Sequence, residues 1–192
     1  MLTVVTGPSR SGKSEWAEEL AHQSQQKVIY IATAQVDPED PEWCDRISQH
    51  QQRRPADWQT MNIQDELATV IATASDRDCL LIDSLGTWVA AYLDQSEADW
   101  NQQTQAFLAA LHNCLASVII VAEETGWGVV PAYPLGRQFR DRLGSLTRQV
   151  SNHADHVFLA VAGYAIDLKH LGVQIPRSIY RNPQDLNHSL AD

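Results

Sequence analysis

The sequence has few cysteines and no long apolar run, and these two features narrow the class of protein. Its three cysteines, Cys44, Cys79 and Cys114, lie far apart and form no C-x-x-C pair, which argues against a disulfide framework or a zinc knuckle. Every apolar stretch is far shorter than the ~18 residues that span a bilayer, and the first one has no basic flank. We therefore expect a soluble, cytoplasmic protein with reduced thiols and no membrane insertion.

Basic residues are also scarce. Lysine and arginine together number 14, against 24 aspartates and glutamates, and the formal net charge is −10. We therefore do not expect a broad basic surface that could bind a nucleic-acid backbone, and we predict no nucleic-acid partner. An anionic ligand would have to be bound by a local motif. With 192 residues, 44% of them apolar and 20% charged, the chain is predicted to form one globular domain.

A local anion-binding device is present near the N-terminus. The stretch Gly7-Pro8-Ser9-Arg10-Ser11-Gly12-Lys13-Ser14 has the spacing of a phosphate-binding loop and stands between an apolar run and a helical pattern. Glycines let the backbone N–H groups point inward, and the following helix directs its positive end at the same anion. Lys13 would reach the β- and γ-phosphates, and the Ser14 hydroxyl would bind Mg²⁺.

The rest of the chain alternates between apolar, β-branched runs and amphipathic runs. Five predicted strands cover 2–5, 28–33, 79–83, 117–122 and 157–162. Helices are predicted from about Glu42 to the stop at Pro55 and over 65–74, 87–93, 100–115 and 135–152. This order indicates an α/β fold of the P-loop NTPase kind, a mainly parallel wound sheet with helices on both faces. We expect one nucleotide-binding domain over residues 1–171 and a polar C-terminal tail over 172–192.

Several of the side chains have two interpretations. Trp88 and Trp100 fit the core or an interface, and the arginines of the helix over 135–152, Arg142 among them, are expected mostly on its outer side. Thr33 either contacts a ligand or is a polar strand end. Asp83 ends a buried apolar run, where a phosphate-loop enzyme places a metal-binding carboxylate. The Gly-rich stretch 123–131 either closes over a ligand or is a flexible connection.

The helix that ends near Pro55 carries a second set of polar candidates. His50 shares a face with Trp43 and Ile47, so spacing alone indicates a packed or hydrogen-bonded histidine. Arg53 and Arg54 follow it, either within reach of an anion or as favourable charge at a helix C-terminus.

Several stretches together resemble one family, the bifunctional adenosylcobinamide kinase / adenosylcobinamide-phosphate guanylyltransferases of cobalamin biosynthesis. The resemblance runs in order from about Leu2 to Gly163. The stretches that carry it are Thr6 to Ser14, Tyr30-Ile31-Ala32-Thr33-Ala34, Arg46-Ile47-Ser48-Gln49-His50-Gln51-Gln52-Arg53-Arg54-Pro55-Ala56-Asp57-Trp58, Leu81-Ile82-Asp83-Ser84-Leu85, Glu123 to Pro131 and Phe139-Arg140-Asp141.

The resemblance implies a two-step activity. Such enzymes phosphorylate adenosylcobinamide with ATP or GTP and then transfer GMP from GTP to that phosphate. By this resemblance His50 would carry the GMP covalently, Lys13 would hold the leaving phosphates, and Asp83 with Ser14 would bind Mg²⁺. A neutral imidazole is a suitable nucleophile near pH 7. The implied nucleotide-binding residues are Gly7, Pro8, Ser9, Arg10, Ser11, Gly12, Lys13, Ser14, Ala32, Thr33, Ala34, Gln51, Gln52, Arg53, Arg54 and Asn62. Members also form trimers, so we expect a homo-oligomer.

The sequence departs from the usual pattern of the family at several positions. Pro8 stands where a second glycine is common and removes one amide donor. Asn62 stands where many members have Glu, Glu123 where many have Asn, and Thr147-Arg148 where many have Asn-Gln. These differences bear on guanine selection, on corrinoid contacts and on the subunit interface.

Two other functions stay open at this point. One is a single-step P-loop kinase acting on another small alcohol, which the His50 element disfavours. The other is a recombinase-like nucleotide-binding ATPase, whose expected basic groove is at odds with the acidic composition.

Overall fold

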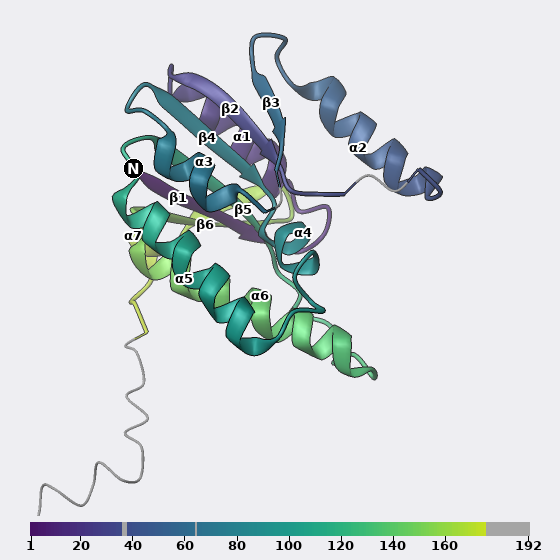
Figure 1. The fold of residues 1–192 in the computed structure, drawn as a ribbon. Coiled ribbons are helices and arrows are strands. Elements are labelled where there is room, and N and C mark those ends of the chain that lie inside the picture. Colours follow the sequence, from purple (N-terminus) through teal and green to yellow (C-terminus); the bar gives the residue numbers. More distant parts are fainter. Residues whose placement is uncertain (36–37, 64, 176–192) are drawn as a thin grey trace, which may run out of the picture.

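A computed structural model describes residues 1–35, 38–63 and 65–175, and its centre is a seven-stranded sheet (Figure 1). The strand order is β3-β2-β4-β5-β1-β6-β7. The strands are β1 (Leu2–Gly7), β2 (Lys27–Ala32), β3 (Gln59–Asn62), β4 (Asp78–Asp83), β5 (Ser117–Glu123), β6 (His156–Val161) and β7 (Tyr164–Asp167). Every pair is parallel except β6–β7. The predicted wound, mainly parallel α/β fold is thereby confirmed.

Two strands were not predicted from the sequence. β3 is Gln-Thr-Met-Asn, with no buried side chain among its residues, and it forms one edge of the sheet beside β2. β7 follows a two-residue turn in which both Ala162 and Gly163 have positive φ, 51° and 80°. Such a turn matches the twist of a hairpin and sends the chain back antiparallel to β6. Short, exposed edge strands lack the apolar pattern on which strand prediction depends.

Seven helices accompany the sheet in the described part of the chain. They are α1 (Lys13–Gln23), α2 (Pro41–Arg53), α3 (Leu67–Thr73), α4 (Leu85–Ala90), α5 (Glu97–Asn113), α6 (Pro134–His153) and α7 (Leu168–Leu171). Four of them begin at a side chain that accepts a backbone N–H: Asp40 for α2, Ser84 for α4, Ser96 for α5 and Asp167 for α7. The bounds of α2 to α6 differ from the predicted bounds by only a few residues.

The two faces of the sheet carry separate hydrophobic clusters. α1 covers one face, where Ala17 and Ala21 pack with Tyr30 and Leu81. The helices α3, α4, α5 and α6 cover the other face (Figure 1), and Trp88 and Trp100 lie in that cluster, 2% and 6% exposed. Helices therefore lie on both faces, as predicted, and the two tryptophans are core residues.

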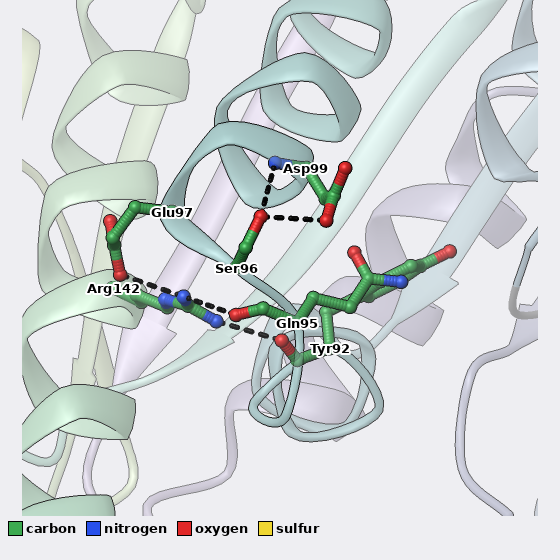
Figure 2. Close-up of polar contacts among 6 residues, drawn as sticks. All are labelled: Tyr92, Gln95, Ser96, Glu97, Asp99 and Arg142. Atoms are coloured by element: carbon green, nitrogen blue, oxygen red, sulfur yellow. Dashed lines mark hydrogen bonds and ion pairs between the residues drawn. The ribbon is translucent and has the colours of Figure 1, made fainter.

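Arg142 of α6 corrects one expectation from the sequence, because it points inward. It is 5% exposed, and its guanidinium donates to the carbonyl oxygens of Tyr92 and Gln95 at 2.7 and 3.1 Å and to Glu97 Oε1 at 2.7 Å (Figure 2). It also lies 5.1 Å from the centre of the Trp100 ring. The side chain thus binds the turn between α4 and α5 to α6, a role that helical spacing could not reveal.

The C-terminal part of the described chain is short and exposed. After α7, residues 173–175 have no regular structure, and most of the predicted tail, 176–192, lies outside the described residues. None of the helices in the described ranges is long and apolar enough to cross a membrane.

Candidate functional site

The candidate site lies where the carboxyl ends of the central parallel strands meet. β4 ends at Asp83, β5 ends at Glu123, and β1 ends at Gly7. Gly7 and Glu123 are register partners across β1 and β5, and the Glu124 N–H donates to the Gly7 carbonyl at 2.9 Å. Ligands of open α/β sheets bind at this edge, so the fold brings the phosphate-binding loop and two carboxylates to one place.

The phosphate-binding loop has the backbone that its sequence requires. A Cβ at Gly7 would collide with the carbonyl of Ala160, and Gly12, the N-cap of α1, has a φ of 92° that L side chains rarely adopt. Lys13 is 7% exposed, and its Nζ donates to the Pro8 carbonyl at 3.2 Å. The lysine therefore lies across its own loop.

The helix that carries His50 lies apart from the sheet. Figure 1 shows α2 beyond β3, separated from the other helices, and none of its described side chains is buried. At its C-terminal end Arg53 pairs with Glu15 of α1 at 2.6 Å and lies 3.6 Å from Glu18. The next residue, Arg54, stacks 3.4 Å above the ring of Tyr30. Polar and stacking contacts thus hold α2 over the site.

His50 is also held by Arg53. The Nη2 atom of Arg53 lies 3.1 Å from Nδ1 of His50. A guanidinium can only donate hydrogen bonds, so Nδ1 is the accepting nitrogen, and a neutral ring carries its proton on Nε2. The hydrogen bond therefore selects the tautomer of the imidazole.

Two adjoining cavities lie between the loop and α2. The larger, about 740 Å³, is lined by Arg10 to Glu15 and by Glu42, Asp45, Gln49, His50 and Arg53. The smaller, about 100 Å³, is lined by both carboxylates and by parts of β2, β3, α2 and α4. Lys13, Ser14 and His50 line both. The larger cavity has the size of a small-molecule site.

The predicted site residues divide between these cavities. The larger one takes in Arg10, Ser11, Gly12 and Arg53. The smaller one takes in Ala32, Ala34, Gln51, Arg54, Asn62 and Asp83. Trp43 and Ile47 also line the smaller cavity, so the apolar face of α2 that carries His50 faces this cavity and not the core.

Five of the predicted residues line neither cavity: Gly7, Pro8, Ser9, Thr33 and Gln52. Thr33 is fully buried. Its hydroxyl donates to the Ser84 carbonyl at 2.7 Å and accepts the Ser84 N–H at 2.8 Å. Its side chain thus joins the ends of β2 and β4, as the alternative of a polar strand end anticipated.

Asp83 and Tyr30 form a pair inside the smaller cavity. The Tyr30 hydroxyl donates to Asp83 Oδ2 at 2.9 Å, and burial, together with the negative charge of Asp83, raises the pKa of Tyr30. The tyrosine therefore stays protonated and orients the carboxylate. Sequence reasoning missed Tyr30 as a site residue because it lies within an apolar strand.

Glu123 is the second carboxylate of the smaller cavity. It accepts hydrogen bonds from the Ser84 hydroxyl and, at 2.8 Å, from the Gly86 N–H. Burial and the negative charge of Asp83 both raise the pKa of the Glu123 carboxyl. The hydrogen bond from Ser84 lowers this pKa, but burial has the larger effect. Its position at the end of an apolar strand is the sequence signal that could have marked it.

The donor groups at this edge fit a magnesium ion. Mg²⁺ prefers oxygen ligands, takes few from the protein and completes its shell with water and phosphate oxygens. The Ser14 hydroxyl and the Asp83 carboxylate line the same cavity beside the phosphate-binding loop, so this donor set suits the ion. Across the described residues, no group of three His, Cys, Asp or Glu side chains is arranged to hold a metal.

Comparison with known proteins decides the family. The sequence pattern of one family, described as "CobU: Cobinamide kinase / cobinamide phosphate guanyltransferase", matches residues 3–168. The chain belongs to this family. The resemblance noted in the sequence is thereby confirmed, and as a member of the CobU family the chain is a kinase and guanylyltransferase of cobalamin biosynthesis.

Individual relatives agree with this assignment. The chain is 35% identical over 184 residues to the bifunctional adenosylcobalamin biosynthesis protein CobU of Escherichia coli K12, with 88% of this chain and all of that protein covered. It is 37% identical over 173 residues to the bifunctional protein CobP of Pseudomonas aeruginosa, with 88% of this chain and 98% of that protein covered. A solved protein of Pyrococcus horikoshii, 8% identical, aligns with a TM-score of 0.55 over 90% of this chain and 87% of its own. That last likeness shows the fold alone.

Proposed function

We propose that both reactions take place in the cleft between the phosphate-binding loop and α2, and that in the second reaction His50 carries GMP from GTP to the acceptor. In the first, adenosylcobinamide is phosphorylated with ATP or GTP. In the second, GTP transfers GMP to His50 with release of pyrophosphate, and the GMP then passes to adenosylcobinamide phosphate to give adenosylcobinamide-GDP. The observation that carries the proposal is that Lys13, Ser14 and His50 line both cavities.

The residues of the cleft suit such a displacement. A triphosphate on the loop would lie against the N–H groups that begin α1 and against Lys13, which stabilise the charge of the leaving pyrophosphate. The same triphosphate would compete with Glu15 for Arg53. Once drawn to phosphate, Arg53 would give up its hydrogen bond to Nδ1 of His50, which removes one contact that holds this ring nitrogen back from attack.

The further parts of the proposal rest on the resemblance and on the chemistry of the site. Ser14 and Asp83 would hold Mg²⁺, which when bound neutralises phosphate charge. A homo-oligomer, a trimer by resemblance, would be the working form, acting in the cytoplasm. Residues 1–171 would form its single nucleotide-binding domain. Of the remaining predicted contacts, Gly7, Pro8, Ser9 and Gln52 would act through the backbone or by shaping the loop and α2, and Thr33 would act by joining the ends of β2 and β4.

The test is covalent labelling. Purified protein is incubated with Mg²⁺ and GTP labelled at the α-phosphorus, separated by denaturing electrophoresis and treated with acid, because a phosphorus–nitrogen bond to histidine is acid-labile. We expect acid-labile label on the wild type and none on His50→Ala. His22→Ala, which changes an exposed histidine of α1, is the matched control and should label normally.

Other results would redirect the proposal. Label that survives in His50→Ala would move the covalent site to another residue. A folded wild type that phosphorylates a small alcohol but takes no label would favour the single-step kinase. Hydrolysis of ATP stimulated by DNA would favour the recombinase-like alternative.

A further inference from the structure

We propose that Glu123 is the catalytic base of the phosphorylation step, the group that accepts the proton of the cobinamide hydroxyl. This inference rests on the proposed function, because it assigns a role in the first of the two reactions. It concerns a carboxylate that the guanylyl transfer through His50 does not use and that stands where many members of the family have Asn, so the role is assigned to this chain and not to the family.

The first argument for this role is the position of Glu123 in the sheet. Glu123 ends β5, which lies between β4, ending at Asp83, and β1, ending at the phosphate-binding loop. Its Cα is the register partner of Gly7, the first residue of the loop. Its side chain lines the cavity that Lys13 and Ser14 also line. A hydroxyl brought into that cavity would therefore lie beside both the terminal phosphate and this carboxylate.

The second argument is that the other titratable groups lining the smaller cavity already have roles. Asp83 accepts the hydrogen bond of Tyr30 and is proposed for Mg²⁺ together with Ser14. His50 is on α2 and is needed as the nucleophile of the other reaction. Among the described side chains that line the smaller cavity, Glu123 is the carboxylate that remains for proton transfer.

The structure holds Glu123 in one orientation. The Ser84 hydroxyl binds Oε1, and the Gly86 N–H binds Oε2. Ser84 and Gly86 belong to the turn that begins α4, whose capping box fixes the serine. A Cβ at residue 86 would collide with the carboxylate, so glycine at this position makes the approach possible. A carboxylate has about four acceptor sites, and two hydrogen bonds leave capacity for the substrate hydroxyl.

The chemistry of the step balances. The hydroxyl oxygen attacks the γ-phosphorus of GTP, a new oxygen–phosphorus bond forms, and the bond from that phosphorus to the β–γ bridging oxygen breaks. The electron pair of the broken bond leaves with GDP. The hydroxyl proton passes to Glu123 and afterwards to water. The raised pKa of Glu123 brings this carboxyl nearer to the range in which a base acts efficiently at neutral pH.

The test separates the two reactions with one nucleotide. GTP labelled at the γ-phosphorus reports transfer to cobinamide, and GTP labelled at the α-phosphorus reports labelling of His50. We expect Glu123→Gln to lower kcat for phosphorylation about 100-fold or more while the rate of His50 labelling changes by less than about threefold, since a general base contributes about 10²–10⁴. In the wild type kcat/KM for phosphorylation should fall toward acid pH, and this limb should be absent from the residual activity of Glu123→Gln.

The control is Glu19→Gln, which removes an exposed carboxylate of α1. Glu19 lines neither cavity of the site, so both rates should stay at the wild-type value. Full phosphorylation by Glu123→Gln would overturn the assignment. So would an equal loss of both reactions, which would place Glu123 in nucleotide binding or in folding.

Different results would contradict the proposed function itself. If the wild type phosphorylates cobinamide but is not labelled, the role of His50 is wrong while the comparison of Glu123→Gln with the wild type still decides the base. If the wild type has no kinase activity, the proposed function is overturned and this assignment with it.

Discussion

Replacing Arg142 with methionine should destabilise the protein strongly, although the residue lies outside the catalytic cleft. Its guanidinium donates to the backbone carbonyls of Tyr92 and Gln95 and to the carboxylate of Glu97 (Figure 2). Methionine fills part of the same volume but donates no hydrogen bond. Two carbonyl oxygens in the turn between α4 and α5 would lose their charged donor.

The size of the effect follows from these contacts. A hydrogen bond to a charged group contributes about 1.5–3 kcal/mol. Glu97 is 73% exposed, so its ion pair with Arg142 is screened and adds about 0–1 kcal/mol. Stacking on Trp100 adds about 0.5–1 kcal/mol. Because the buried apolar surface of methionine recovers about 1.5–3 kcal/mol of the total, we expect a loss of about 3–5 kcal/mol in the free energy of unfolding. For a chain of this length that lowers Tm by about 10 °C.

Urea unfolding followed by circular dichroism measures this loss, with two matched variants. Arg148→Met removes an exposed arginine of the same helix and should change the free energy of unfolding by less than about 0.5 kcal/mol. Glu97→Gln removes only the screened charge and should cost less than about 1 kcal/mol. A cost below about 1 kcal/mol for Arg142→Met, or an equal cost for Glu97→Gln, would refute the view that the two carbonyls carry the effect.

Two further predictions concern stability. Gly12→Ala should lower the free energy of unfolding, measured with urea, by about 1–2 kcal/mol, because a φ of 92° is strained for alanine. Gly144→Ala lies in the exposed middle of α6 with open space around the added Cβ, and it should raise the free energy of unfolding by about 0.5–1 kcal/mol. Equal effects of the two substitutions would contradict the argument from backbone strain. Hydrogen bonds from the Ser75 hydroxyl and N–H lower the pKa of Asp78, so the folded state binds fewer protons at this group than the unfolded state, and its stabilisation is present above the ordinary pKa and lost as pH falls below it. Unfolding measured from pH 7 to pH 2 should therefore show a smaller acid loss for Asp78→Asn than for the wild type, and an unchanged loss would show that the group does not contribute.

The order of elements and the phosphate-binding loop could be predicted because their signals are local. Buried parallel strands such as β4 and β5 are continuous apolar runs, and α4 and α5 begin at serines that cap them. The edge strands β3 and β7 could not be predicted in this way. None of their residues is buried, and only pairing with β2 and β6 makes them strands.

Site residues that belong to a sequence motif could be predicted. Residues whose role depends on tertiary contacts were harder to predict. Lys13, Ser14, Asp83 and His50 come together at one cleft. Spacing alone indicated a packed histidine at position 50, because Trp43 and Ile47 on the same face look like core residues. That face lines a cavity, a fact that depends on where α2 lies relative to β3. Tyr30 and Arg142 were missed or misplaced for the same reason, since long-range contacts decide their roles.

The exposed position of α2 has a consequence for how its sequence can change. None of its described side chains is buried, so the stability of the domain places few demands on them. In a library of single substitutions across Pro41 to Arg53, the amount of folded protein should vary little while catalytic output varies widely. The effect of a substitution in this helix on catalytic output would then reflect the chemistry of the cleft, with almost no contribution from folding. In the strands of the central sheet, by contrast, a substitution would alter folding as well.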